Sequence, residues 1–146
     1  MNDVPMIRRE RPDWDTYFLT IAQAVSLRGD CTRRQVGAVL VKDNRIIGTG
    51  YNGAPPGDPG CLTDHACPRG QMPDGEVVHG VGYDKTGCIA WHAEDNAIAF
   101  AVNETQGATI YVTCTPCAGC AEKIEKAGIV RVVAMTPYPQ QRGEVQ

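Results

Sequence analysis

The sequence predicts an α/β fold in which helices cover a central mixed β-sheet. Apolar residues recur at helical spacing in some segments and form short β-branched runs in others. These two patterns follow one another along the chain in the order α-β-β-α-β-α-β. A chain of 146 residues fits one domain and can bury a core of its own. We therefore expect a single domain over residues 1–146, with a core over about 14–136 and an exposed tail over 137–146.

The first half of this core begins with an amphipathic helix over residues 13–28, for which Asp13 is a plausible N-cap. Its apolar side chains recur every three or four residues, at Trp14, Phe18, Ile21 and Val25. The run "QVGAVLV" (35–41) is rich in β-branched residues and predicts a buried strand. The segment "KDN" (42–44) has the composition of a turn, so "RIIGTGY" (45–51) is expected to pair back as a hairpin.

The second half of the core predicts two further pairs of helix and strand. The expected elements are a helix over about 92–103, a strand over 109–114, a helix over 117–128 and a strand over 129–135. Gly128 stands where a helix commonly ends. Phe100 is expected in the core, on the apolar face of the first of these helices.

A long loop over residues 52–89 separates the two halves. It holds half of the chain's glycines and half of its prolines, together with three cysteines and two histidines. A loop of this length is too long to be a plain connection in a compact domain. We expect it either to be mobile or to be held by additional bonds.

Composition and charge exclude several classes of function. The formal net charge is −3 and the sequence pI is about 5.5, which argues against a protein that binds long nucleic acid. No apolar run approaches the roughly 20 residues that span a bilayer, so no membrane is expected as a partner. The first 14 residues are charged and lack the apolar core of a signal peptide. The sequence therefore predicts a cytoplasmic protein, in which local arginines can still bind a small anionic ligand.

Seven cysteines are many for an intracellular chain, and there they favour metal binding or catalysis over disulfides. Cys117 and Cys120 are three residues apart at the start of an expected helix, where partial positive charge favours the thiolate. His92, also at the start of a helix, can supply a third ligand. Three protein ligands and one open position are typical of a catalytic zinc site. Glu94 follows closely enough to act there as the proton-transfer group.

These residues also form a known signature. His92-Ala93-Glu94 followed by Pro116-Cys117-Ala118-Gly119-Cys120 matches the H-x-E and P-C-x-x-C motifs of zinc nucleobase deaminases. The order of elements resembles the cytidine deaminase fold. Within that superfamily, "HAEDNAI" (92–98) resembles the HAExNAI form of deoxycytidylate deaminases, and "QVGAVLV" and "GYNGAP" (50–55) resemble their first strand and following loop. The resemblance extends over about residues 14–136.

The resemblance implies the hydrolytic deamination of dCMP to dUMP and ammonia, in pyrimidine nucleotide metabolism. It gives Glu94 the role of carrying protons to N3 of the base and to the leaving amine. The backbone near Ala93 would contact the pyrimidine, and Asn52 would bind the sugar. The 5′-phosphate needs cations, for which the candidates are Arg28, Arg33 and Arg34, with Arg28 preferred. Members of the family commonly form oligomers, so a homo-oligomer is expected.

Four further cysteines can form a second, closed zinc site of the structural type: Cys31, Cys61, Cys67 and Cys88. Such a site would hold the long loop where an apolar core is missing. Phage deoxycytidylate deaminases resemble this pattern at Cys31 and Cys61 and depart from it at the other two ligands, so His65 or His79 can replace Cys67 or Cys88. Cys114, on an expected strand, is interpreted as a buried apolar residue.

Two alternatives remain open. The substrate can be another cytosine nucleoside or nucleotide, or a modified pyrimidine nucleotide. In the other alternative, the protein is a non-catalytic zinc-binding module. Glu94 argues against that second reading, because a structural zinc site has no use for a carboxylate beside its histidine ligand.

Overall fold

The computed structural model describes residues 10–78 and 80–136. The elements are α1 (Trp14–Ser26), β1 (Gly37–Lys42), β2 (Arg45–Tyr51), α2 (Cys61–Asp64), the 3₁₀ helix η1 (Arg69–Gln71), α3 (Ala93–Ala99), β3 (Thr109–Cys114), α4 (Ala118–Lys126) and β4 (Arg131–Thr136). The predicted order of helices and strands is confirmed. The expected tail over 137–146 lies outside the described residues.

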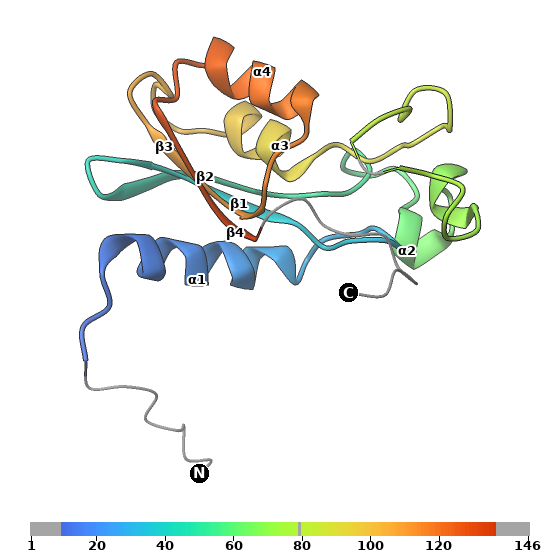
Figure 1. The fold of residues 1–146 in the computed structure, drawn as a ribbon, viewed down its shortest axis with the longest axis horizontal. Coiled ribbons are helices and arrows are strands. Elements are labelled where there is room, and N and C mark those ends of the chain that lie inside the picture. The colour runs from blue at the N-terminus through green and yellow to red at the C-terminus, as the bar shows by residue number, and fades with distance from the viewer. Residues whose placement is uncertain (1–9, 79, 137–146) are drawn as a thin grey trace.

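The four strands form one mixed sheet in the order β2-β1-β3-β4. β1 pairs antiparallel with both β2 and β3, whereas β3 and β4 are parallel. α1 covers one face of the sheet, and α3 and α4 cover the other (Figure 1). The α/β class and the mixed sheet predicted from the sequence are therefore confirmed.

β1 lies in the middle of the core because both of its faces are buried. Ala38 and Leu40 point to the side of α3 and α4, and both are fully buried. Val39 and Val41 point to the opposite side, where they pack with Phe18 of α1. The β-branched run read from the sequence is thus a strand between two apolar layers.

Local signals set the ends of several elements. The Asp13 carboxylate accepts a hydrogen bond from the backbone N–H of Thr16 at 2.7 Å, which confirms the predicted N-cap of α1. Asp43 and Asn44 join β1 to β2 with φ values of 51° and 58°, as a two-residue type I′ hairpin turn requires. Gly128 follows the C-cap of α4 with a φ of 75°, which confirms the predicted helix end.

The prediction for the end of α3 was wrong. The helix ends at Ala99 rather than near residue 103, and the Phe100 side chain is 58% exposed instead of lying in the core. The chain leaves the helix because the backbone N–H of Val102 donates to the Ile47 carbonyl of β2 at 2.8 Å. That bond turns the last residues of the predicted helix along the strand and carries Phe100 outward.

The long loop has structure of its own, since it contains both α2 and η1. It lies at the end of the sheet from which α3 begins (Figure 1). Side chains that precede β1 hold it. The Asp30 carboxylate accepts hydrogen bonds from the backbone N–H groups of Leu62 and Thr63, and Arg33 donates to the carbonyls of Arg69 and Met72. In the described part of the chain, no helix is long and apolar enough to cross a membrane.

Candidate active site

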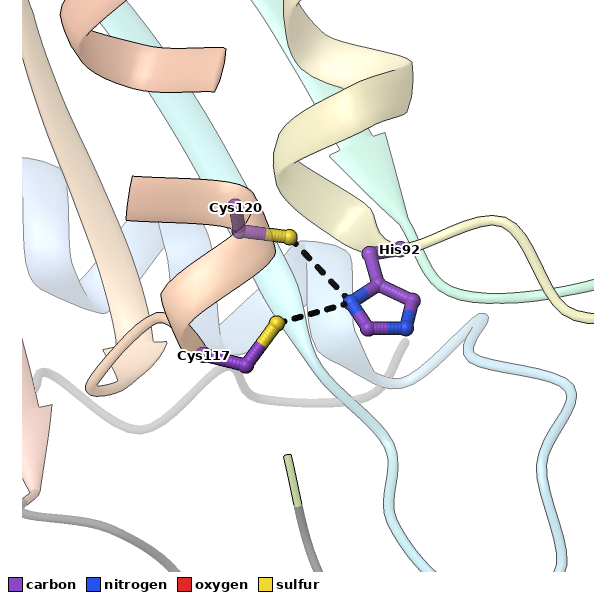
Figure 2. A group of neighbouring side chains, drawn as sticks. All are labelled: His92, Cys117 and Cys120. Atoms are coloured by element: carbon purple, nitrogen blue, oxygen red, sulfur yellow. Dashed lines mark hydrogen bonds between the residues drawn. The ribbon is translucent and has the colours of Figure 1, made fainter. Parts of the chain in front are cut away.

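Three predicted metal ligands meet at the N-terminal ends of α3 and α4. His92 is the N-cap of α3, Cys117 is the N-cap of α4, and Cys120 lies in the first turn of α4. The Nδ1 atom of His92 lies 3.1 Å from Cys120 Sγ and 3.6 Å from Cys117 Sγ (Figure 2). The sequence pattern therefore predicted a real cluster, built from two helix starts that are distant in sequence.

Close packing fixes where these helix starts lie. Gly50 of β2 lies against the first turns of α3, and a Cβ atom at this position would collide with the backbone of Ala93 and Ala97. Only glycine allows the strand and the helix to approach this closely. An ion pair of 2.8 Å between Asp95 and Lys123 links α3 to α4.

The electrostatics of the cluster favour a thiolate. A hydrogen bond from Cys120, followed by one from His92, lowers the pKa of Cys117 to about 3. The same bond to Cys117, together with burial, raises the pKa of Cys120. The hydrogen bond with Cys117 likewise raises the pKa of His92. Both sulfurs must be deprotonated to bind a metal ion, so metal binding at this cluster releases protons.

The donor set fits zinc. Zn–S bonds of about 2.3 Å and Zn–N bonds of about 2.1 Å at a tetrahedral centre separate the two kinds of ligand atom by about 3.6 Å. This equals the 3.6 Å between His92 and Cys117, and the 3.1 Å to Cys120 is somewhat shorter. All three ligand atoms lie within 4.8 Å of one another, the one group in the described part of the chain that does so. Two sulfurs and one imidazole are typical of a catalytic zinc site.

Glu94 lies beside this cluster and is almost completely buried, with 4% of its surface exposed. It lines the same cavity as His92 and Cys117. Burial raises the pKa of its carboxyl group above the ordinary value for glutamate, which makes the protonated form easier to populate than it is in water. A buried carboxyl with a raised pKa next to a metal site can both accept and donate a proton.

The predicted substrate contacts have separate outcomes. Ala93 and Asn52 line the cavity, as do Arg33 and Arg34. Arg28 is exposed and is absent from this lining; its guanidinium lies over the ring of Tyr51, 5.8 Å from the centroid.

Asn52 has a structural role that the sequence did not reveal. Its Oδ1 accepts from the N–H of Val36, and its Nδ2 donates to the carbonyl of Arg34, both at 2.9 Å. One amide side chain thus fixes the backbone on both sides of Gln35, just before β1. An asparagine amide can make further hydrogen bonds, so Asn52 keeps one N–H and one lone pair that can face a ligand.

The four cysteines predicted to bind a second zinc also line this cavity: Cys31, Cys61, Cys67 and Cys88. Burial raises the pKa of Cys88 to about 11, and Cys67 and Cys31 also raise it. In the described part of the chain these four cysteines do not form a compact group of ligand atoms like that of His92, Cys117 and Cys120. His65, the alternative ligand, is exposed and is not among the cavity residues, and His79 lies outside the described residues. Cys114 is buried on β3, as predicted.

Two residues of the site were missed by the sequence analysis. Arg69 and Tyr83 both belong to the long loop and line the cavity. Neither lies in a periodic pattern or a motif, so the sequence carried no signal for them.

The fold and the donor set define a zinc-binding α/β domain with a buried carboxylate, which is the arrangement of a deaminase. Residues 12–136 match the family described as the cytidine and deoxycytidylate deaminase zinc-binding region. This match covers most of the chain, and the protein belongs to that family. The resemblance inferred from the two short motifs is confirmed.

Individual relatives show how far the similarity extends. The chain is 50% identical over 135 residues to the deoxycytidylate deaminase of Mycobacterium phage D29, covering 90% of this chain and 98% of that protein. It is 40% identical to the deoxycytidylate deaminase of Schizosaccharomyces pombe, over 89% of this chain but only 39% of that longer protein. The dCMP deaminase of cyanophage S-TIM5, solved in complex with dCMP and dUMP, has a TM-score of 0.63 and 25% identity over 89% of this chain and 86% of its own.

Proposed function

We propose that this protein catalyses the hydrolytic deamination of dCMP to dUMP, with release of ammonia. The observation that carries the proposal is the buried carboxyl of Glu94, which lines one cavity with His92 and Cys117 of the three-residue cluster that these two form with Cys120. The named activity of the phage and yeast relatives supports dCMP as the substrate.

Glu94 is the catalytic residue of this proposal. When bound, zinc supplies a Lewis acid that lowers the pKa of water toward neutrality. Glu94 accepts the first proton from the attacking water and delivers it to N3 of the cytosine; it then accepts the second proton from the hydroxyl that has added to C4 and delivers it to the leaving amine. The site consumes one water and releases one ammonia, and Glu94 returns to its starting state. Its burial suits this role, because the raised pKa lets the same carboxyl act in both directions.

Three further residues hold the substrate. Ala93 is the first residue of α3, where backbone N–H groups have no partner within the helix and can face the pyrimidine. Asn52 contacts the sugar through the second N–H of its amide or the second lone pair of Oδ1, which its two hydrogen bonds to the backbone do not use. We assign the 5′-phosphate to Arg34 in place of Arg28, because Arg34 lines the cavity and its backbone is held by Asn52. Arg33 also lines the cavity, and its guanidinium holds the long loop through the carbonyls of Arg69 and Met72.

A substrate panel tests the proposal. The zinc-loaded protein is incubated with dCMP, CMP, deoxycytidine and dCTP, and both ammonia and the uracil product are measured. We expect dCMP to react fastest by a wide margin. A preference for another of the four would retain the chemistry and change the substrate. If none reacts, modified pyrimidine nucleotides or a non-catalytic zinc module become the better description.

The variant Glu94→Gln tests the proton transfer. It should keep zinc and fold while the rate falls by about 10²–10⁴-fold, the usual contribution of general acid–base catalysis. Glu125→Gln, on the exposed side of α4, is the matched control and should keep the full rate. An unchanged rate in Glu94→Gln would remove Glu94 from the mechanism.

We also propose a second, structural zinc held by Cys31, Cys61, Cys67 and Cys88. Burial alone would raise the pKa of Cys67, but hydrogen bonds from the backbone of Ile89 and Gly70, and from Cys61 and Cys88, lower it overall. The electrostatic effect of Cys31 contributes to raising the pKa values of both Cys61 and Cys88. Metal analysis should give two zinc ions per chain, falling to one in Cys67→Ser and staying at two in Cys114→Ser. One zinc per chain in the unmutated protein would rule out the second site.

The assembly and location are proposals of the same kind. None of the seven cysteines is in a disulfide, which supports a reducing, cytoplasmic environment. The exposed rings of Trp14 and Tyr17 support a homo-oligomer. Sedimentation of the zinc-loaded protein at several concentrations measures the assembly, and a monomer at all of them would contradict it.

A further inference from the structure

The most unusual group near the site is a buried arginine in the long loop. The Arg69 side chain belongs to η1, and the residue is only 4% exposed. Its guanidinium donates to the carbonyls of Val78 and Val81 at 2.7 and 3.0 Å, and to the Thr86 hydroxyl at 2.8 Å. All three acceptors are neutral, and they come from one stretch of the loop. Arg69 therefore ties Val78, Val81 and Thr86 of the loop to one side chain.

The same guanidinium lies on the ring of Tyr83. Its Cζ atom is 4.3 Å from the ring centroid, within the range of a cation–π contact. The Tyr83 hydroxyl accepts a hydrogen bond from the backbone N–H of Gly80 at 3.0 Å. Tyr83 is thus held at its face by Arg69 and at its hydroxyl by the backbone.

The ring of Tyr83 in turn contacts a metal ligand. Its centroid lies 4.8 Å from that of the His92 imidazole, and the two ring planes meet at 81°, an edge-to-face arrangement. The position of the imidazole decides whether Nδ1 points at the two sulfurs, because rotation of the ring would move this atom away from them. Groups that orient a ligating histidine contribute substantially to metal affinity.

We propose that Tyr83 is a positioning residue that fixes the imidazole of His92 for zinc binding, and that Arg69 holds Tyr83 in that place. The contact links the long loop to the catalytic cluster through two rings and one guanidinium. The loop therefore acts on the metal site itself, in addition to enclosing the cavity.

Zinc affinity and cobalt spectra test this inference. The metal-free protein is titrated with zinc in competition with a chelator, and separately with Co²⁺, whose visible absorption reports the geometry of its ligands. We expect Tyr83→Leu to weaken zinc binding at the catalytic site by about 10–100-fold and to alter the cobalt spectrum. Tyr83→Phe retains the ring and should stay within about threefold of the unmutated protein. To isolate one site, the same titrations are run on Cys117→Ser, which lacks the catalytic site, and the binding that remains there is subtracted.

The companion variants separate positioning from general loosening of the loop. Arg69→Lys keeps the charge but loses the planar fork that reaches three acceptors, so it should weaken zinc binding in the same direction. Tyr51→Leu is the control, because the Tyr51 ring also contacts an arginine, Arg28, but lies away from the cluster. The zinc affinity of this variant should not change. If Tyr83→Leu binds zinc and cobalt as the unmutated protein does, or if Tyr83→Phe is impaired as strongly as Tyr83→Leu, the inference is wrong. Neither readout needs turnover, so the result is independent of the proposed substrate.

Discussion

The catalytic cluster and the long loop lie side by side but are held by different kinds of contact. The cluster is formed by the first turns of α3 and α4, which pack on the sheet through small and apolar side chains such as Ala93, Ala97 and Ile124. The long loop is held instead by hydrogen bonds from the polar side chains of Asp30, Arg33 and Arg69. The comparison shows that apolar packing in the core sets the positions of the metal ligands. The hydrogen bonds of Asp30, Arg33 and Arg69 hold the long loop beside those ligands, where it lines the cavity.

The largest expected effect comes from removing a ligand of the cluster. Cys117→Ser should lose the catalytic zinc and lower the rate by about a thousandfold or more, because the Lewis acid is gone. The domain should still fold, since α4 remains packed through Ile124. Zinc content, deamination rate and thermal unfolding measure these three outcomes.

The matching change in the loop is Cys67→Ser, which leaves His92, Cys117 and Cys120 in place. It should retain measurable activity while the loop becomes easier to cleave with protease. Equal loss of activity in both variants would mean that the two regions do not differ as described.

A backbone contact in the core should have the next largest effect. Gly50→Ala places a methyl group against the backbone of Ala93 and Ala97, so β2 and α3 must move apart to make room for it. We expect the free energy of unfolding to fall by about 3 kcal/mol, which is at the upper end of the range for overpacking. Zinc affinity should also fall, because α3 shifts. Denaturant unfolding measures the first effect.

Gly119→Ala is the control for this prediction. Nothing lies within 4 Å of a Cβ atom at this position in α4, so alanine should stabilise the helix by about 0.5–1 kcal/mol. Similar stability of the two alanine variants would contradict the proposed role of Gly50.

The same comparison explains what the sequence could predict. Elements with a clear period were predicted well, and β2 and β3 have the expected bounds. The cluster was predicted because H-x-E and P-C-x-x-C place their ligands at helix starts, where short-range geometry is sufficient. Phe100 was assigned wrongly because its spacing continued the apolar face of α3 beyond the point where Val102 bonds to Ile47.

The loop could not be predicted in the same way. α2 and η1 are short and depend on partners that are distant in sequence, as in the bond from Arg33 to the Met72 carbonyl. Arg28 was preferred over Arg33 and Arg34 for the phosphate, and the sequence held no signal that could correct this choice. The structure places Arg33 and Arg34, but not Arg28, in the lining of the cavity. Arg69 and Tyr83 gain their importance from contacts with one another and with His92, which no local pattern encodes.

A smaller and local effect is expected where Asp30 holds α2. Its carboxylate accepts from the N–H groups of Leu62 and Thr63 at 2.6 and 3.0 Å and from the Thr63 hydroxyl at 2.8 Å, so it serves as an N-cap from outside the helix. In Asp30→Ala, amide hydrogen exchange at Leu62 and Thr63 should become about tenfold faster, the equivalent of losing one cap. Exchange in β1 should not change. Faster exchange throughout the sheet would show that the loop and the core are not independent.

The smallest expected effect is an exposed contact on the far side of the core. The hydrogen bonds from Arg131 and then Tyr111 lower the pKa of Asp15 to about 2. Because the folded pKa lies below the unfolded value of about 3.9, this contact stabilises the protein above pH 4 and the stabilisation is lost as pH falls from 4 to 2.

The variant Asp15→Asn should therefore lower the melting temperature by about 2 °C at pH 7, and the difference should shrink below pH 4 and in 1 M salt. Asp58→Asn, on the exposed long loop, is the control and should show no such dependence. A difference that persists at pH 2 would assign the stabilisation to packing around Asp15 rather than to its charge. Neither variant should change zinc binding, because the Asp15 contact joins α1 to β3 and β4 and touches neither the cluster nor the long loop.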